Sequence, residues 1–292
     1  MNFFEKFDRI DRRIIYILVL LALSLQLIGG LSLPPARMAP AGEAFDIIKK
    51  LEPSKGKLVF ISLDFGPNSL AENLPQSEIV IEHLLMKKIP FVLFSQYVLA
   101  EGFLESVPRR VSERLLASGM LKTAPVYGKA WSNIGYRPGG SIFIQSLAGS
   151  DDIISLLIRD ARGNRLKDLP MFDQVKDIRS FSLVVQLTSL LGTLDTFLQF
   201  FQRAEYRPPL VHGCTAITIP AAYIYRDSGQ IAGLFEGIAG AAWYSALLDK
   251  EYPGRPQDKS KSINTGLGVA HLVIIAMILL GNIGFFLRRK TK

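Results

Sequence analysis

The chain has 292 residues, 49% of them hydrophobic, and a formal net charge of +8 at pH 7. Part of the positive charge lies in two short tails, so the middle is weakly basic and lacks the basic stripe that binds nucleic acid. A single cysteine, Cys214, excludes an internal disulfide and any site built from paired cysteines. No cofactor and no metal is predicted.

The first predicted element is a transmembrane helix over 14–34, which follows a cytoplasmic tail over 1–13. No charged residue lies between Arg13 and Arg37, and about 20 apolar residues span the hydrocarbon core of a bilayer. A basic start, an apolar stretch and the small residues 39–41 also fit a cleavable signal peptide, although its apolar core is usually shorter. Both interpretations export the chain that follows.

The middle of the chain, 43–258, is predicted to form one α/β domain. Short apolar runs alternate in it with longer helical patterns, which is typical of a parallel sheet buried on both faces. The predicted strands are 57–65, 89–98, 141–149, 180–189 and 209–220. The sequence therefore predicts an open, mostly parallel five-stranded domain of the flavodoxin-like or Rossmann-like kind.

Open sheets of this kind bind ligands beyond the carboxyl ends of their strands. Asp64 ends the first predicted strand and is a weak candidate for an acidic nucleophile or metal ligand; the alternative is a carboxylate that only fixes its loop. The polar residues expected at this rim as ligand-binding candidates are Asp64, Ser95, Gln96, Ser146, Ser150, Thr188 and Ser189, with Gln230 in a further binding turn.

Common catalytic motifs are missing from the sequence. It contains no phosphate-binding GxxxxGK[ST] loop, no GxSxG nucleophile elbow and no HExxH zinc motif. His212 and Cys214 are two residues apart and face the same side of a strand, but a buried thiol beside a strand-end imidazole explains them better than a catalytic pair. The sequence leaves open whether the protein is an enzyme.

The stretch 229–248 has one charged residue, Glu236, and small residues at helical spacing. A membrane span here would have to bury that carboxylate near its centre, at a cost of a few kcal/mol. We therefore expect the last helix of the domain, pressed closely against the sheet, rather than a third span.

A second transmembrane helix is predicted over 262–287, before a basic cytoplasmic tail over 288–292. This span contains small and polar residues, which allow helices to approach closely and to bond across their contact. The predicted helix-contact residues are Gly266, Ala270, His271, Gly281 and Asn282.

Basic residues flank both spans on their outer sides, so the positive-inside rule places both termini in the cytoplasm. The protein is then a two-pass protein of the cell inner membrane, and its α/β domain faces the periplasm or the cell exterior. The contrast in charge is small, because basic residues also flank the spans on their inner sides.

The stretch "TAITIPAAYIYRDSGQIAGLFEGIAGAA" and the later "LLGNIGFFL", together with the flanking spans, resemble a group of uncharacterised bacterial two-span membrane proteins with an α/β extramembrane domain. The resemblance covers most of the chain. It implies no activity and no site residues.

Two classes of function remain. The first is a non-catalytic subunit or scaffold of a membrane protein complex, whose partners are the lipid bilayer and other membrane protein subunits or further copies of itself; nucleic acid is not expected. The alternative is a membrane-tethered enzyme or small-ligand sensor that uses the strand-end rim around Asp64.

Overall fold

A computed structural model describes residues 12–29, 32–202 and 206–290 of the chain. The chain divides into two compact units. One is the continuous segment Ala36–Ser260, and the other is formed by Met1–Pro35 together with Lys261–Lys292.

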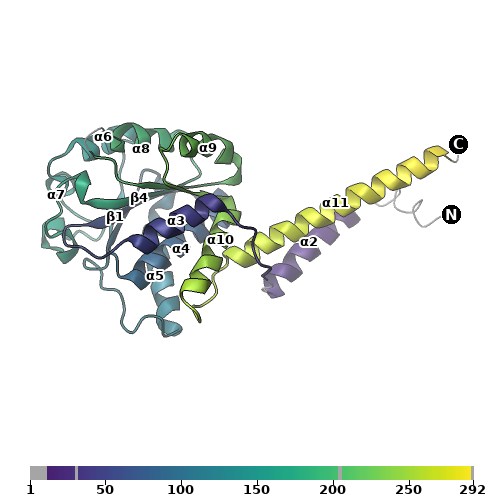
Figure 1. Ribbon diagram of the computed structural model, residues 1–292, viewed down its shortest axis with the longest axis horizontal. Coiled ribbons are helices and arrows are strands. Elements are labelled where there is room, and N and C mark those ends of the chain that lie inside the picture. The colour runs from purple at the N-terminus through teal and green to yellow at the C-terminus, as the bar shows by residue number, and fades with distance from the viewer. Residues whose placement is uncertain (1–11, 30–31, 203–205, 291–292) are drawn as a thin grey trace. The chain divides into compact units, whose positions relative to one another are not determined.

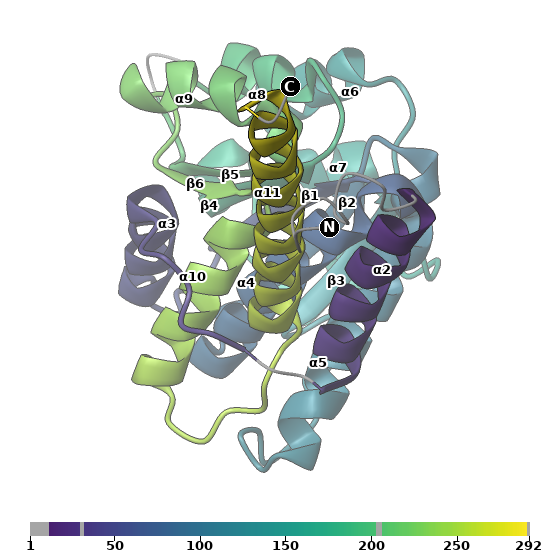
Figure 2. The same ribbon diagram turned by 90° about the vertical axis from the view of Figure 1, so that its right-hand side faces the viewer.

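The unit Ala36–Ser260 is built on one six-stranded sheet in the order β3-β2-β1-β4-β5-β6. All five neighbouring pairs are parallel, and Figure 2 shows the strands in this order across the domain. This is the strand order of the doubly wound Rossmann-like fold. The strands are β1 (Leu58–Asp64), β2 (Phe91–Ser95), β3 (Trp131–Tyr136), β4 (Phe181–Thr188), β5 (Leu210–Cys214) and β6 (Gly233–Glu236).

Helices cover both faces of the sheet, as Figure 1 shows. One face carries α3 (Ala39–Lys50), α4 (Leu70–Lys87), α5 (Glu101–Ala117) and α10 (Gly237–Glu251). The other face carries α6 (Ser141–Gly149), α8 (Thr193–Phe201) and α9 (Ile219–Asp227), with the short α7 (Ile153–Leu157). This arrangement explains why the strands are unbroken apolar runs, since both of their faces are buried.

Aromatic side chains form the centre of the core between the sheet and the second group of helices. Phe60 of β1 stacks on Phe94 of β2 and on Phe181 of β4, with ring centroids 4.5 and 4.6 Å apart. Phe197 and Phe201 of α8 pack onto the same cluster. Fully buried aromatic rings stabilise a core strongly, because each removes a large apolar area from water.

Two sequence predictions about this domain were wrong. Residues 141–149, predicted as the third strand, form helix α6, and the third strand is β3, ten residues earlier in the chain. The sheet has six strands rather than five, because the start of the predicted helix 229–248 contains β6. The helix begins only at Gly237, whose positive φ of 57° ends the strand with a sharp turn.

The second unit contains two helices, α2 (Arg12–Gly29) and α11 (Ser260–Lys290), the latter beginning at the last residue of the α/β unit. Among the described residues one segment, Ser260–Leu279, is long and apolar enough to cross a membrane. Helix α2 covers most of the predicted first span, and residues 30–31 of that span lie outside the described residues. The backbone amide of Leu33 donates to Oγ1 of Thr265 across this unit, at 2.9 Å.

Candidate functional site: the carboxyl edge of the sheet

The strand order reverses between the parallel strands β1 and β4. After β1 the chain adds β2 and β3 on one side, and after β4 it adds β5 and β6 on the other. Ligands of open α/β folds bind beside such a reversal, outside the carboxyl ends of the strands. Asp64 ends β1 and is paired in register with Thr188, which ends β4. The first predicted candidate therefore lies where this fold usually binds ligands.

Asp64 is fully buried and its carboxylate is bonded on both oxygens. Oδ2 accepts from the Ser62 hydroxyl at 2.5 Å, and Oδ1 accepts from the Ser95 hydroxyl at 3.1 Å and from the backbone amide of Gln96 at 2.7 Å. Burial raises the pKa of the Asp64 carboxyl, while these hydrogen bonds oppose the rise. The carboxylate joins the end of β1 to the end of β2.

The same residue also joins β1 to β4 through its backbone. The carbonyl oxygen of Asp64 accepts from the Thr188 hydroxyl at 3.1 Å and from the backbone amide of Ser189 at 3.2 Å. Every one of these contacts is made by the chain itself. Asp64 is thus placed to hold three neighbouring strand ends in a fixed arrangement.

Two buried polar atoms beside this network have no close hydrogen-bond partner among the described residues. They are Oδ1 of Asn73 and Nε2 of Gln96, although the Gln96 side chain lies near enough to the Asp64 carboxylate to help lower its pKa. The orientation of Asn73 follows from Gln76, whose Nε2 donates to the carbonyls of Cys214 and Gly237. Oε1 of Gln76 must therefore face Asn73 and accept from its Nδ2, at 3.0 Å. Buried polar atoms normally have partners, so these two mark the part of the edge best suited to a small polar ligand or water.

A second polar group lies at the ends of β5 and β6. Glu72 of α4 accepts from the backbone amide of Ala216 at 2.8 Å, and Glu236 accepts from the Tyr223 hydroxyl. Burial raises the pKa of the Glu236 carboxyl, and its Oε2 has no partner among the described residues. Glycine is favoured at position 237 by its φ of 57°, and a β-carbon would also come within 2.4 Å of the Glu72 carboxylate, which would have to move.

His212 and Cys214 of β5 are both buried. Burial lowers the pKa of His212 to about 4 and raises the pKa of the Cys214 thiol to about 11. Nδ1 of His212 contacts Oε1 of Gln186 at 3.1 Å. A protonated thiol held in the core is a poor nucleophile, which agrees with the predicted structural role of this pair.

The structure brings together some of the predicted ligand-binding candidates and separates others. Ser95, Gln96, Thr188 and Ser189 gather around Asp64. Three do not, since Ser146 and Ser150 lie in and after helix α6, and Gln230 lies in the turn that leads into the opposite, amino end of β6.

The predicted contact residues of the second span lie in helix α11, and their surroundings differ. Gly266 and Ala270 are buried, four residues apart and therefore on one face of the helix. His271 and Asn282 are exposed, and the structure gives only the helical backbone at Gly281.

The carboxyl edge also carries a feature that the sequence analysis missed, which we call the apolar rim. Large apolar side chains project into solvent from the segments that follow β2, β3, β4 and β5. They are Val98, Leu99, Ile142, Leu191 and Ile217. The segments 65–69, 96–100, 189–193 and 215–221 contain no charged residue. Uncharged strand-to-helix loops were the sequence signal that could have revealed the rim.

In the described part of the chain, no three His, Cys, Asp or Glu side chains are grouped closely enough to hold a metal ion. Comparison of the chain with protein-family models, with curated proteins and with solved structures finds no match.

Proposed function

We propose that the protein is a non-catalytic, membrane-anchored subunit whose α/β domain binds another membrane protein subunit through the apolar rim. The observation that carries the proposal is the exposure of five large apolar side chains on one edge of the sheet. Ile217 and Leu191 are 89% and 82% exposed.

The five side chains follow four strands of one sheet, on either side of β1. Five neighbouring strands at about 4.8 Å spacing cover roughly 20 Å, which is wide enough for a protein contact. Large apolar side chains exposed together on one edge of a domain often mark a surface that binds a partner.

The chemistry of the partner follows from the lack of charge on these loops. A charged partner surface would lose its hydration against the rim without finding an opposite charge. Segments that dock on membranes combine apolar and basic side chains. The loops 96–100, 189–193 and 215–221 contain no basic residue, and Arg137, in the loop after β3, donates to backbone carbonyls of Ile134 and Arg159. The partner that fits is a protein surface that is itself apolar and uncharged.

The anchor in this proposal is helix α11, with the predicted span 14–34 as its companion. The charge of the flanking segments favours cytoplasmic termini and a periplasmic or extracellular domain in the cell inner membrane. A reporter that is active only outside the cytoplasm, fused after Lys261, should be active. An inactive reporter that is still produced would contradict this orientation.

The rim is tested with the double variant Leu191→Ser/Ile217→Ser, compared with Val126→Ser/Leu156→Ser. The control pair is also exposed and apolar, 61% and 41%, but lies outside the rim. The full chain is purified from membranes in mild detergent through a C-terminal tag, and its complexes are weighed by native mass spectrometry. We expect a second protein in fixed ratio with the wild type and the control, and its loss with the rim variant.

A rim variant that keeps the partner would contradict the proposal. A wild-type chain that emerges only with further copies of itself would show that the rim binds a second copy, and would also overturn the assignment to a different subunit. Unchanged thermal unfolding of the rim variant is required, so that loss of the partner is not loss of the fold.

A second candidate function rests on the unpartnered Nε2 of Gln96 and Oδ1 of Asn73 beside Asp64. Under this alternative the domain senses or modifies a small polar ligand at the strand reversal. The variant Gln96→Leu should then abolish retention of a small molecule in the same mass spectra while leaving protein partners in place. Absence of any retained small molecule in the wild type would count against this alternative.

A further inference from the structure

The opposite, amino edge of the sheet differs from the apolar rim because lysines are concentrated on it. The segments 50–57, 87–90 and 122–130 lead into β1, β2 and β3, and Glu52 is their one acidic residue. We call their lysines the lysine edge: Lys50, Lys55, Lys57, Lys87, Lys88, Lys122 and Lys129. All are exposed except the half-buried Lys87.

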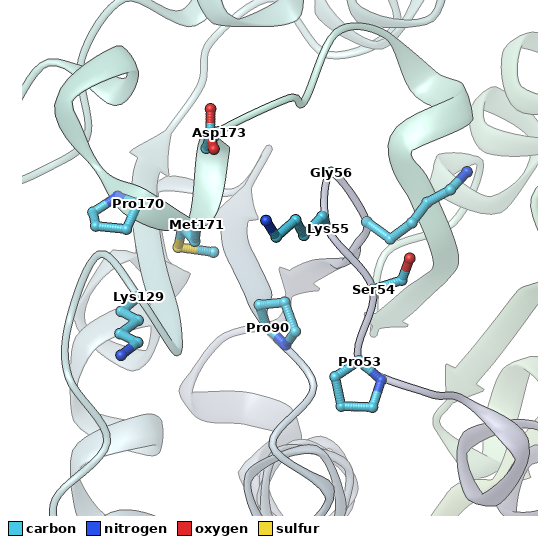
Figure 3. A pocket seen from close by; sticks show the side chains of 10 residues that line it. Pro53, Ser54, Lys55, Gly56, Pro90, Lys129, Pro170, Met171 and Asp173 are labelled. Carbon is cyan, nitrogen blue, oxygen red and sulfur yellow. The ribbon is translucent and has the colours of Figure 1, made fainter.

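Two cavities of about 360 Å³ each open on this edge and share Lys129 as a lining residue. Prolines 53, 90 and 170 line the first, and Figure 3 shows Lys55 extending into it toward Met171. Lys88 and the apolar residues Leu121 and Val126 line the second. The lysine edge therefore contains two cavities that are lined by lysine side chains together with apolar residues.

The hydrogen bonds that Lys57 and Lys87 donate go to uncharged carbonyl oxygens, and Lys57 also lies close enough to Asp177 to help lower the pKa of that carboxyl. Nζ of Lys57 donates to the carbonyl of Arg179 at 2.5 Å, and Nζ of Lys87 donates to the carbonyl of Lys49 at 2.8 Å. Asp173 is the one acidic residue that lines either cavity. The edge thus presents net positive charge to whatever lies against it.

The segment that precedes α11 is held against helix α4, whose carboxyl end carries Lys87. Arg255 is buried and pairs with Glu82 of α4 at 2.7 Å and with Asp258, which in turn accepts from the hydroxyl of Ser260. Glu82 precedes Lys88 by six residues, about 9 Å along a helix axis. A run of buried contacts thus connects Ser260, the first residue of α11, to helix α4, which ends at Lys87.

We infer that the lysine edge binds the anionic headgroups of the bilayer in which α11 is anchored. The inference rests on the proposed membrane anchoring. Basic residues next to a membrane helix are attracted to anionic lipids, and each contributes measurably to binding. Lysine suits this role because its flexible, hydrated ammonium follows a fluid surface without fixed geometry.

The test uses the full chain in nanodiscs of phosphatidylcholine, with or without phosphatidylglycerol, and backbone hydrogen exchange read by mass spectrometry. Anionic lipid should slow exchange severalfold in 51–57 and 121–130 and leave 96–100 and 189–193 unchanged. High salt should remove the slowing, because it screens the attraction.

The variant Lys55→Gln/Lys129→Gln should lose most of the slowing. A matched control, Arg109→Gln/Arg165→Gln, removes the same charge from exposed positions outside the lysine edge and should keep it. Exchange that is the same in neutral and anionic nanodiscs, or equal effects of both variants, would overturn the inference.

Two further outcomes separate this inference from the proposals on which it rests. A chain that alkaline carbonate extracts from membranes would overturn the anchoring itself, whereas an anchored chain with unchanged exchange would overturn only the lipid contact. Slowing by an added oligonucleotide, without slowing by anionic lipid, would show that the edge binds nucleic acid and would also overturn the inference.

Discussion

At the scale of single residues, Asp64 lies at the strand reversal, where ligand-binding residues are usually found in this fold. Its hydrogen bonds, however, are those expected of a residue that stabilises the fold. Replacing Asp64 with alanine leaves the Ser62 hydroxyl and the Gln96 amide without their acceptor, while the Ser95 hydroxyl keeps the Tyr97 carbonyl. We expect Asp64→Ala to lower the free energy of unfolding by about 3 kcal/mol, because buried unpaired donors are costly.

Asp64→Asn should cost less, about 1 kcal/mol, since its amide oxygen can still accept from the Gln96 amide while its Nδ2 donates to Ser62. Chemical denaturation of the full chain in mild detergent measures both variants. An Asp64→Ala variant that is as stable as the wild type would contradict the structural role and favour a catalytic or ligand-binding one.

His83 of α4 is a second residue that the fold buries, although charged residues lie on either side of it in the sequence. It is buried, stacked on Phe45, and its Nδ1 contacts the Tyr244 hydroxyl at 2.6 Å. Burial, with help from Lys87 and Lys49, lowers the pKa of His83 from 6.5 to about 3.

This shift makes folding sensitive to acid. Below about pH 6.5 the unfolded chain binds a proton at His83 that the folded chain does not, so stability falls by about 1.4 kcal/mol per pH unit as the pH drops toward 3. His83→Gln should remove this contribution to the dependence of the free energy of unfolding on pH, between about pH 6 and pH 4. Equal slopes for the variant and the wild type, from denaturation at each pH, would show that His83 is protonated in the fold.

At the scale of elements, buried ion pairs fix the segment after α10. Arg255 lies between Glu82, Asp249 and Asp258, and Glu82 also pairs with Arg114 of α5 at 2.8 Å. Removing one partner from a buried pair leaves uncompensated charge and usually costs about 3–5 kcal/mol.

Arg255→Met should therefore lower the free energy of unfolding by several kcal/mol, whereas Arg109→Met should change it by less than about 0.5 kcal/mol. Arg109 is the control because its contact with Glu113 is long, 3.9 Å, and exposed. Similar stabilities of the two variants in denaturant titrations would mean that the network contributes little.

Helix α3 lies so close to strand β6 that only glycine fits at position 233. A β-carbon there would lie 2.7–2.8 Å from the backbone and side chain of Ala44. We expect Gly233→Ala to lower the midpoint of thermal unfolding by several degrees, because α3 must move away from the sheet. The control Gly102→Ala, with open space around its position in α5, should leave the midpoint unchanged or raise it, since alanine favours helix.

Four of the five predicted strands are confirmed. They could be recognised in the sequence because strands that are buried on both faces consist of long apolar runs. The edge strand β3, with the sequence WSNIGY, lacks such a run, and the apolar SIFIQSLAG that follows was mistaken for it. β6 has four residues, too few for periodicity to separate from the helix that follows.

The residues of the candidate site were placed correctly wherever the strand that precedes them was predicted correctly. Correct ends for β1, β2 and β4 placed Asp64, Ser95, Gln96, Thr188 and Ser189 at one edge of the sheet. The predicted positions of Ser146 and Ser150 at this edge were wrong because the third strand was assigned to the wrong segment. The predicted position of Gln230 was wrong because β6, which follows it, was not recognised. The unpartnered atoms of Asn73 and Gln96 depend on side-chain contacts between distant segments, which no sequence pattern reports.

At the scale of the whole α/β unit, the two edges of the sheet carry different chemistry. The carboxyl edge has exposed apolar side chains on loops whose one charged residue is Arg137, after β3, whereas the amino edge has seven lysines, four of which line two cavities. An edge with little charge suits a protein contact, whereas a basic edge suits an anionic surface. Under the proposed function the domain therefore binds lipid with one edge and its partner subunit with the other.

The measurement that tests this account most directly is site-specific photo-crosslinking in intact membranes, with a photoreactive amino acid in place of Ile217 and, in a separate chain, in place of Val126. Both positions are exposed, and position 126 lies at the lysine edge, away from the apolar rim. The account predicts a discrete cross-linked product with a different membrane protein from position 217 and none of that mass from position 126. No product from position 217, or the same product from both positions, would contradict a protein contact at the apolar rim.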